Sequence, residues 1–463
     1  MGSDSETIEL RSGCRYVRDG DWIESKDQGG SDYRLIQISN IGVGRFVETG
    51  NVRCITRETF KRLQCTDIAP GDVLVARMPE PTGRAWFVEA LPQPSVTAVD
   101  VAIIRPDPAV LDGRYLAYYL NSPANLQEVQ GLTTGTTRAR IRRADLERLP
   151  IWAPPLKEQR RIAGILGALD DKIELNRCIS QTLESMASAL FKSWFVDFDP
   201  VRAKAEGREL GVPAPIADLF PDSFEETEFG QTPSGWEIDS IENVAERVAM
   251  GPFGSSIRVD TFVPDGVPVI SGQHLRGVLL DDSDFNFVTI EHADRLSRSN
   301  VQRGDVVFTH AGSIGQAAYI PESARYDRYI VSQRQFYMRC DTARVSPLYV
   351  VSYFQSPEGR RRLLANTSST GVPSISQPVS YLKQLRLALP PQPLMNAFDA
   401  VARSLYSRTA AHTRQSRELA DVRNELLPHL LTGSSGILER HCAEAISGES
   451  QGGSVSTLEG CAL

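Results

Sequence analysis

Clusters of arginine with neighbouring hydroxyl and amide side chains are the residues of this sequence best suited to chemistry with another molecule. The densest cluster lies between Thr136 and Arg143. Alternation along an extended segment would place Arg138, Arg140 and Arg142 on one side. Guanidinium groups bind phosphates and the edges of guanine bases through paired hydrogen bonds. The cluster therefore predicts contact with nucleic acid, although solvated protein surfaces carry such clusters as well.

Polar side chains elsewhere in the chain extend this hypothesis. Thr136 and Thr137 stand beside the first arginines, and Ser374 and Gln377 occupy the corresponding place later in the sequence. Their hydroxyl and amide groups could contact DNA, or could cap turns. The complete set of predicted DNA-contacting residues is Thr136, Thr137, Arg138, Arg140, Arg142, Gln273, His274, Arg334, Ser374 and Gln377.

The sequence lacks the motifs of enzymes that act on nucleic acids. The dipeptide Gly-Lys never occurs, which excludes the phosphate-binding loop G-x-x-x-x-G-K-[ST]. No Asp-Pro-Pro-aromatic motif of an amino-methyltransferase is present. The six histidines are scattered and no C-x-x-C pair exists. We therefore predict no catalytic residue, no metal site and no cofactor in this chain.

Composition limits where such a protein works. The 463 residues carry a net charge of −8, which argues against coating nucleic acid by bulk charge but allows local basic patches. No apolar run approaches the roughly 20 residues of a membrane span. The seven cysteines are an odd number, which favours reduced thiols. With a polar, acidic N-terminus, these features predict a cytoplasmic protein without membrane contact.

An internal duplication organises the elements that must carry the basic clusters. Residues 115–123 (YLAYYLNSP) match residues 349–357 (YVVSYFQSP) at four of nine positions. Pro154-Pro155 likewise matches Pro390-Pro391. Landmarks at one slowly drifting offset, 234 to 236, predict two similar halves. Each half has short β patterns with Gly and Pro turns, followed by a long helical pattern.

These patterns divide the chain into six parts. The proline content of residues 199–235 predicts a connector, and the glycine and serine content of residues 433–463 predicts a disordered tail. The predicted parts are a first β-rich domain at 1–153, a first long helix at 154–198, the connector at 199–235, a second β-rich domain at 236–389, a second long helix at 390–432 and the tail at 433–463.

The two predicted helices share a heptad pattern whose polar positions match. Adding 236 places Asn176 and His412 at one core position, and Lys172 and Arg408 at another. Polar residues in such a seam fix the register of paired helices at some cost in stability. The matched positions favour two helices that pack on each other over two amphipathic helices that each pack on their own domain.

Three segments, together with the duplication and the paired helices, carry a resemblance to a known family. They are residues 135–176, which begin GTTRARIRRADLERLP, the segment Gly251-Pro252-Phe253-Gly254-Ser255, and residues 304–315. Over about residues 20–432 the chain resembles the specificity subunit of type I restriction–modification systems.

The resemblance implies a fold and a role. The fold class would be α+β, with two β-rich target recognition domains in tandem duplication joined by two long helices that form an antiparallel coiled coil. Each domain would read one half of a bipartite DNA target, and the helices would set the spacing. The chain would be non-catalytic and would bind double-stranded DNA, two methyltransferase subunits and, for restriction, two motor-nuclease subunits. S-adenosylmethionine, ATP and Mg²⁺ would belong to those partners.

Two departures from the family pattern affect these expectations. The first helix opens with Glu158-Gln159, which the resemblance assigns to docking of a methyltransferase subunit, whereas the second opens with Pro391-Gln392-Pro393-Leu394-Met395. Residues 78–83 stand where the second half has Gly312-Ser313-Ile314-Gly315. An alternative reading is a structural coiled-coil protein whose β domains bind protein or glycan, which would not bind DNA.

Overall fold

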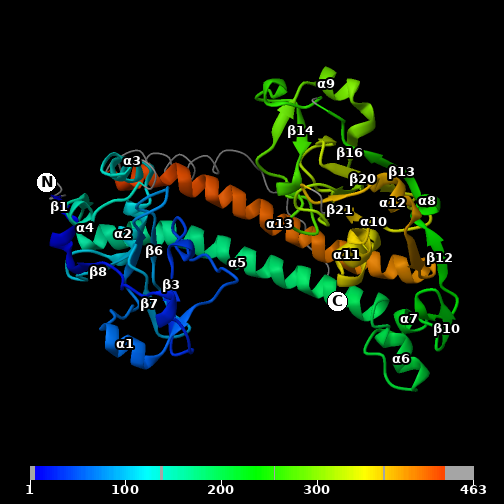
Figure 1. Cartoon of the computed structure of the whole chain (residues 1–463), viewed down its shortest axis with the longest axis horizontal. Helices are drawn as coiled ribbons and strands as arrows, with labels where there is room; N and C mark the ends of the chain where they lie inside the picture. The colour runs from blue at the N-terminus through cyan, green and yellow to red at the C-terminus, as the bar shows by residue number, and fades with distance from the viewer. Residues whose placement is uncertain (1–5, 136–138, 255, 369–370, 433–463) are drawn as a thin grey trace, which may run out of the picture. The chain divides into compact units, whose positions relative to one another are not determined.

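The computed structural model describes residues 6–135, 139–254, 256–368 and 371–432. Within them the chain forms two compact units, each combining one β-rich domain with segments of two long helices (Figure 1). Unit 1 holds the residues up to Glu174 together with those from Arg417 onward, and unit 2 holds Leu175–Ser416. The predicted tail at 433–463 lies outside the described residues.

Helices α5 (Leu156–Phe195) and α13 (Gln392–Leu431) are the two long helices, of 40 residues each. The sequence placed them at 154–198 and 390–432. In unit 2 the Asn176 amide donates to Gln415 at 2.9 Å, and the ring of Phe191 lies 5.7 Å from that of Phe398. Residue numbers increase along α5 in the direction in which they decrease along α13. The helices therefore pack antiparallel, as predicted.

The buried face of each helix is wider than a coiled-coil seam, and this corrects the predicted register. Leu166, Ala187 and Ala402 are buried, and they lie four residues after the core positions 162, 183 and 398. A strict heptad would instead bury the residues three positions after these, but Ile165 is only partly buried and Met186 and Val401 are exposed. Arg408 is exposed and Lys172 is only half-buried. In each unit, the segments of α5 and α13 pack on the β-rich domain as well as on each other. This buries the wider i, i+4 face of an ordinary amphipathic helix.

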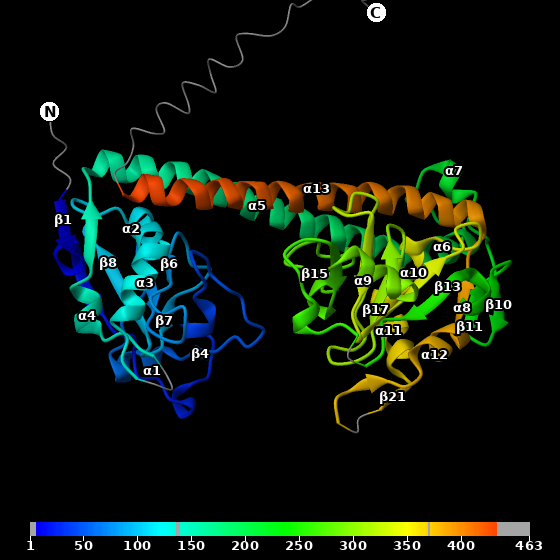
Figure 2. The ribbon, with the colours of Figure 1, turned by 90° about the horizontal axis from the view of Figure 1, so that it is seen from above.

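The domain of unit 1 contains three small sheets, in the orders β2-β8-β5-β6, β4-β3-β7 and β1-β9. Helix α2 packs against β5 and β6 (Figure 2). The strands are β1 Glu6–Glu9, β2 Cys14–Arg18, β3 Tyr33–Ile36, β4 Cys54–Ile55, β5 Val73–Ala76, β6 Ala85–Phe87, β7 Ser95–Thr97, β8 Val101–Pro106 and β9 Pro150–Ala153; the helices are α1 Arg57–Leu63, α2 Gly113–Leu120, α3 Pro123–Gly131 and α4 Arg143–Glu147.

The domain of unit 2 repeats this plan, with sheets β13-β20-β17-β18, β15-β14-β19-β16 and β12-β23 and the added pairs β10-β11 and β21-β22. Its strands are β10 Phe224–Thr227, β11 Gly230–Pro233, β12 Glu237–Ser240, β13 Ala245–Met250, β14 Val267–Ile270, β15 Asn286–Val288, β16 Asn300–Gln302, β17 Val306–Thr309, β18 Ala317–Tyr319, β19 Arg328–Val331, β20 Gln335–Cys340, β21 Thr367–Ser368, β22 Ser374–Ile375 and β23 Arg386–Leu389. Its shorter helices are α6 Asp199–Ala205, α7 Ala214–Ala217, α8 Ile241–Val244, α9 Ile290–Arg295, α10 Pro347–Gln355, α11 Pro357–Leu364 and α12 Pro378–Gln384.

A buried ion pair recurs in the central sheet of both units. The carboxylate of Asp72, 1% exposed, accepts two hydrogen bonds from Arg105 at 2.7 and 2.8 Å. Asp305, also 1% exposed, accepts two from Arg339 at 2.8 and 2.7 Å. Bidentate pairing satisfies a carboxylate that burial would otherwise penalise. With the repeated sheet orders, the pair confirms the predicted tandem duplication.

The proline-rich segment at 199–235 forms ordered elements of unit 2. Helices α6 and α7 and the hairpin β10–β11 occupy most of it. Val201 and Phe220 are buried, and the Phe220 ring meets Trp194 of α5 edge to face at 5.2 Å. Pro200 and Pro215 lie in the first turns of α6 and α7, where no N–H donor is needed. Among the described helices, none is long and apolar enough to cross a membrane.

Candidate nucleic-acid interface

The predicted basic cluster of unit 1 is partly neutralised by acidic side chains of the same unit. Thr136, Thr137 and Arg138 lie outside the described residues. The Arg140 guanidinium lies 2.8 Å from the Asp100 carboxylate and its side chain is 42% exposed. A DNA phosphate or base must compete with Asp100 for Arg140.

Arg142 also has an acidic partner. It precedes helix α4 and donates two hydrogen bonds to Asp145, at 2.6 and 3.0 Å. These bonds raise the pKa of Arg142, which stays cationic. Ile141 is fully buried between Arg140 and Arg142, whose side chains are 42% and 68% exposed, and this fits the predicted alternation. An exposed pair of this kind contributes little to stability, so Arg142 can exchange partners cheaply.

A buried arginine that sequence reasoning missed lies behind this cluster. Arg77, 3% exposed, contacts Asp19 at 2.9 Å and donates to the carbonyl oxygen of Val99 at 3.0 Å. Burial lowers the pKa of Arg77, and the neighbouring Asp19 and Asp100 oppose that effect. The Arg77 guanidinium also lies 3.9 Å from the Asp100 carboxylate that Arg140 uses. No local pattern marks this role, since its partners lie far away in the sequence.

The backbone identifies the corresponding place in unit 2. The N–H of Arg77 donates to the carbonyl of Asp100, and that of His310 donates to the carbonyl of Arg334, both at 2.9 Å. Ile141 in turn donates to Arg77, as Ile375 does to His310. Asp100 of unit 1 and Arg334 of unit 2 are thus structural equivalents, and the charge at this point is reversed between the two domains.

Arg334 lines a hollow of about 320 Å³ that we call the polar hollow. Neither Arg334 nor Arg276, which also lines the hollow, has an acidic partner within the described part of the chain, and both are exposed. The hollow therefore presents two available cations. Its lining residues are Gly272, Gln273, Arg276, Thr309, Ala311, Ser313, Gln316, Arg334 and Gln335. The sequence had pointed to Gln273 and Arg334 of this set.

His274 does not belong to the surface of the polar hollow, which corrects its predicted DNA contact. It is 2% exposed, its ring lies 4.3 Å from that of Phe285, and its Nδ1 accepts the N–H of Ser271 at 2.9 Å. Burial lowers the pKa of His274. In unit 1, Asn40 accepts the N–H of Gln37 in the same way at 2.9 Å. Both side chains close a tight turn.

Ser374 and Gln377 lie beside the polar hollow without lining it. Ser374 is half-buried in β22 and bridges Ala311, a lining residue, through backbone hydrogen bonding. Gln377 is exposed, has a φ of 44°, and precedes helix α12. The structure therefore brings Gln273 and Arg334 together in the polar hollow, and Ser374 lies next to it through its backbone contact with Ala311. Gln377 belongs to the turn that starts α12.

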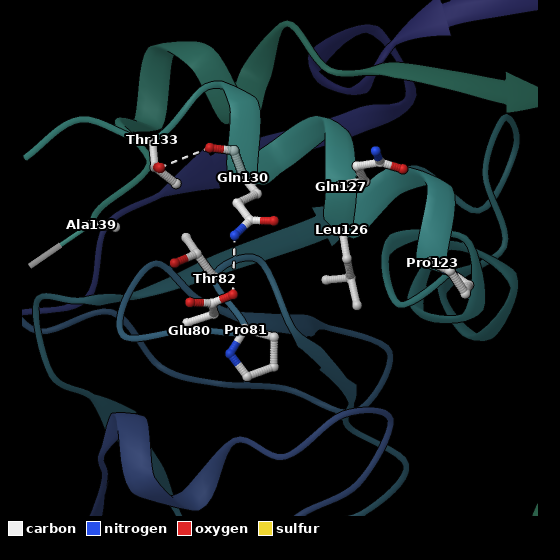
Figure 3. Close-up of a pocket in the computed structure, with 9 residues that line it drawn as sticks. All are labelled: Glu80, Pro81, Thr82, Pro123, Leu126, Gln127, Gln130, Thr133 and Ala139. Carbon is white, nitrogen blue, oxygen red and sulfur yellow. Dashed lines mark hydrogen bonds between the residues drawn. The ribbon is translucent and has the colours of Figure 1, made fainter. Parts of the chain in front are cut away.

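A second hollow, in unit 1, lies between the loop at 80–82 and helix α3 (Figure 3). The Gln130 amide donates to the Glu80 carboxylate at 3.0 Å across it. Its volume is about 250 Å³ and Glu80 is its only charged lining residue. A carboxylate repels phosphate, so this hollow is poorly suited to a nucleic acid. Its lining residues are Glu80, Pro81, Thr82, Pro123, Leu126, Gln127, Gln130, Thr133 and Ala139.

The loops at 78–83 and 312–315 share one structural device despite their different sequences. Gly83 has a φ of +89° and Gly315 has a φ of +78°. A Cβ on Gly83 would lie 2.8 Å from Val129, and one on Gly315 would lie 3.1 Å from Leu364. In both units the turn after the central strand thus needs glycine to pack on the following helix pair.

Gln159 is buried, so it is not available to dock another subunit, and this corrects its predicted role. It is 1% exposed; its carbonyl oxygen accepts the N–H of Asp112 at 2.8 Å, and its amide donates to the carbonyls of Val110 and Pro154. Glu158 is half-buried and makes two hydrogen bonds with Arg161, which lower the pKa of Glu158.

Met395 explains how the second helix dispenses with Glu-Gln. The sulfur of Met395 accepts the N–H of Ser346 at 3.0 Å, as the Gln159 oxygen accepts that of Asp112. Both residues fasten the first turn of a long helix to the N-terminus of the domain helix, α10 or α2. The shared geometry explains the missing Gln of the second helix as a change of internal acceptor.

The polar positions of the helix pair divide into two kinds. Asn176 is fully buried; its amide donates to Gln415, and its carbonyl oxygen lies 3.2 Å from Nδ1 of His412. These two predicted residues meet. Lys172 and Arg408 lie at the edge of the buried face or outside it. Within the described residues, no group of three or more His, Cys, Asp or Glu side chains could hold a metal ion.

Several known proteins are similar to this chain in sequence. Residues 3–185 match the family model described as type I restriction modification DNA specificity domain. The type I restriction enzyme HindI specificity subunit of Haemophilus influenzae is 23% identical over 429 residues, which cover 83% of this chain and 90% of that protein. The MjaIX specificity subunit of Methanocaldococcus jannaschii is 22% identical over 431 residues, covering 90% and 87%.

A solved structure shares the fold. The crystal structure of a type I restriction-modification system S subunit from M. genitalium aligns with a TM-score of 0.55 at 12% identity, over 93% of this chain and 96% of that one. At this identity the similarity concerns the architecture of paired β-rich domains and long helices.

Proposed function

We propose that this chain is a type I restriction–modification DNA specificity subunit whose two β-rich domains each read one half of a split DNA target. The duplication carries this proposal. Units 1 and 2 repeat the same sheets, the same buried Asp–Arg pair and the same attachment to the long helices. Two copies of one recognition fold in a single chain suit two separate half-sites better than one continuous sequence.

The reversed charge at one equivalent point gives the two domains different chemistry. Unit 1 has Asp100 with Arg140, whereas unit 2 has the available cation of Arg334. The two half-sites should therefore differ in sequence. Arg140, Arg142 and Arg334 supply phosphate and base contacts, and helices α5 and α13 set the spacing between the half-sites.

Partner subunits would supply the chemistry of the complex. We assign two methyltransferase subunits to modification and two motor-nuclease subunits to restriction, with S-adenosylmethionine, ATP and Mg²⁺ bound by those partners. The missing catalytic motifs of this sequence support a non-catalytic role. Glu158, on the first turn of α5, is the remaining candidate for methyltransferase docking. Such a complex would work in the cytoplasm, where its DNA substrate is.

Mapping methylated adenines genome-wide tests the proposal. Cells would express the chain with the methyltransferase subunit of its own genome, and control cells would express the methyltransferase alone. Two short specific segments separated by a non-specific gap are expected only in the presence of the chain. One continuous motif, or methylation that does not depend on the chain, would contradict the proposal.

A further inference from the structure

The polar hollow of unit 2 combines unused donors with an unused acceptor. Arg276 and Arg334 have no acidic partner among the residues that the structure describes. The amide nitrogen of Gln273 donates to the carbonyl oxygen of Asp284 at 3.3 Å, and the amide oxygen keeps no such partner there. The hollow therefore offers two planar cations and one carbonyl acceptor to a ligand.

Gln335 and Thr309, two further polar residues of the lining, already bond within the protein, and Ser313 adds one exposed hydroxyl. Gln335 is 1% exposed and its amide oxygen accepts the hydroxyl of Ser332. The hydroxyl of Thr309 lies 3.3 Å from the side-chain amide of Gln316 within the hollow. Recognition at this surface must therefore come mainly from Arg276, Arg334 and Gln273.

The ligands that DNA presents differ in how well they match this set. Phosphate oxygens only accept hydrogen bonds, so a phosphate would leave the oxygen of Gln273 unsatisfied. In the major groove a G·C pair presents two adjacent acceptors, guanine O6 and N7, and one donor, the cytosine amino group. In an A·T pair the amino donor separates the two acceptors, and a forked guanidinium fits them less well.

We propose that the polar hollow reads a G·C pair in the half-site of the second domain, with the forked guanidinium of Arg334 on guanine O6 and N7, Gln273 on the cytosine amino group, and Arg276 adding positive charge beside them. The inference rests on the proposed function and adds the class of base pair and the residues that select it. The equivalent point of unit 1 holds Asp100, which already binds Arg140. The first domain should therefore not select guanine at this place.

Three variants of the full chain, assembled with its methyltransferase, test the inference. Arg334→Ala should relax one G·C position of one half-site, with a loss of preference of about 5- to 150-fold. Arg334→Lys keeps the charge but loses the fork, so it should relax the same position while the salt dependence of binding stays the same. Arg361→Ala, which removes an exposed arginine paired with Glu358 in α11, should leave the motif unchanged.

The assay is selection of bound sequences from a randomised DNA library, with binding of one optimal site measured over a range of salt concentrations. Uniformly weaker binding with an unchanged motif and a salt slope smaller by about one would assign Arg334 to a phosphate and overturn the inference. An unchanged motif and slope in Arg334→Ala would overturn it too. Failure of the proposed function is distinct, because the wild-type complex would then select no bipartite motif at all.

Discussion

Asn176 and His412 meet side chain to side chain, and 412 − 176 is 236, the offset of the duplication near the helices. The equivalent polar residues of the two helices are therefore placed against each other, with the Asn176 oxygen 3.2 Å from Nδ1 of His412. An antiparallel pair of duplicated helices has one point where equivalent residues coincide. A polar residue there fixes the register, because any shift would bury it without a partner.

Replacing the central asparagine should weaken the helix pair. Asn176→Ala removes the hydrogen bonds to Gln415 and His412 and should cost about 1–2 kcal/mol of unfolding free energy. A double-mutant cycle with Gln415→Ala, measured by urea denaturation, should give a coupling of about 0.5–1.5 kcal/mol. Additive effects would mean that the hydrogen bond contributes nothing to register.

The control for this cycle tests the corrected register as well. Arg408→Ala changes an exposed residue that a strict heptad would place in the core, and it should alter the unfolding free energy by less than about 0.5 kcal/mol. A loss of several kcal/mol would contradict the corrected register and support a strict heptad with Arg408 in the core.

The hydrogen-bond acceptor in the first turn of α5 can be replaced by the one that α13 uses. Gln159→Met copies Met395, so the N–H of Asp112 would still find a sulfur acceptor, but the carbonyls of Val110 and Pro154 would lose their donor. We expect a loss of about 2–3 kcal/mol, measured by thermal or urea unfolding. Retention of full stability would show that water replaces the amide.

A variant at Glu158, next to Gln159, distinguishes an effect on stability from an effect on subunit docking. Glu158→Ala removes a partly exposed ion pair and should change stability by less than about 1 kcal/mol. If Glu158 docks the methyltransferase subunit, that subunit should co-purify in smaller amounts with the variant. Co-purification at the wild-type level would remove Glu158 from the docking site.

His274 predicts how stability depends on pH. Burial lowers its pKa in the folded state, so below about pH 6.5, the ordinary value, the unfolded chain binds more protons than the folded one. Its contribution is therefore full above that value and is lost as pH falls. His274→Asn copies Asn40, which closes the same turn without titrating. The variant should unfold with a weaker dependence on pH between 7 and 5, followed by calorimetry; an identical dependence would contradict the assignment.

Removing the negative charge of Asp100 should strengthen DNA binding. Asp100→Asn releases Arg140 from its ion pair, and the freed guanidinium should bind DNA with a salt slope steeper by about one. Asp145→Asn, which frees Arg142, is the matched variant on the same cluster. If neither variant changes the slope in fluorescence anisotropy titrations, Arg140 and Arg142 do not face DNA.

Repetition made the architecture predictable. The duplicated landmarks and the recurring apolar positions of the helices come from residues close in sequence or separated by one fixed offset. These signals were sufficient for the two β-rich domains, the two long helices and the contact of Asn176 with His412. The second line of the helix seam was wrong because the domains widen the buried face, which a helix pattern alone does not reveal.

Side-chain partners were the part that could not be predicted. Gln159 looks exposed in a helical pattern, yet its three partners come from a loop about 50 residues earlier and from the turn before the helix. Arg140 is predicted to be free for DNA, yet the strand pairing of β8 brings the Asp100 carboxylate into an ion pair with it. His274 resembles a polar contact residue, although its turn buries it. Only the assembled sheets bring these groups together.

Lengthening both helices at the boundary between the units tests the central claim most directly. Seven residues of helix-forming sequence would be inserted after Glu174 and after Ser416, which leaves the contacts within each unit in place. Seven residues add about 10 Å at nearly the same helical phase. At roughly 3.4 Å per base pair, the gap between the half-sites should grow by about three base pairs while both half-sites stay the same. Methylated-adenine maps of cells carrying the wild-type and lengthened chains measure this. An unchanged gap in an active variant, or altered half-sites, would contradict the account.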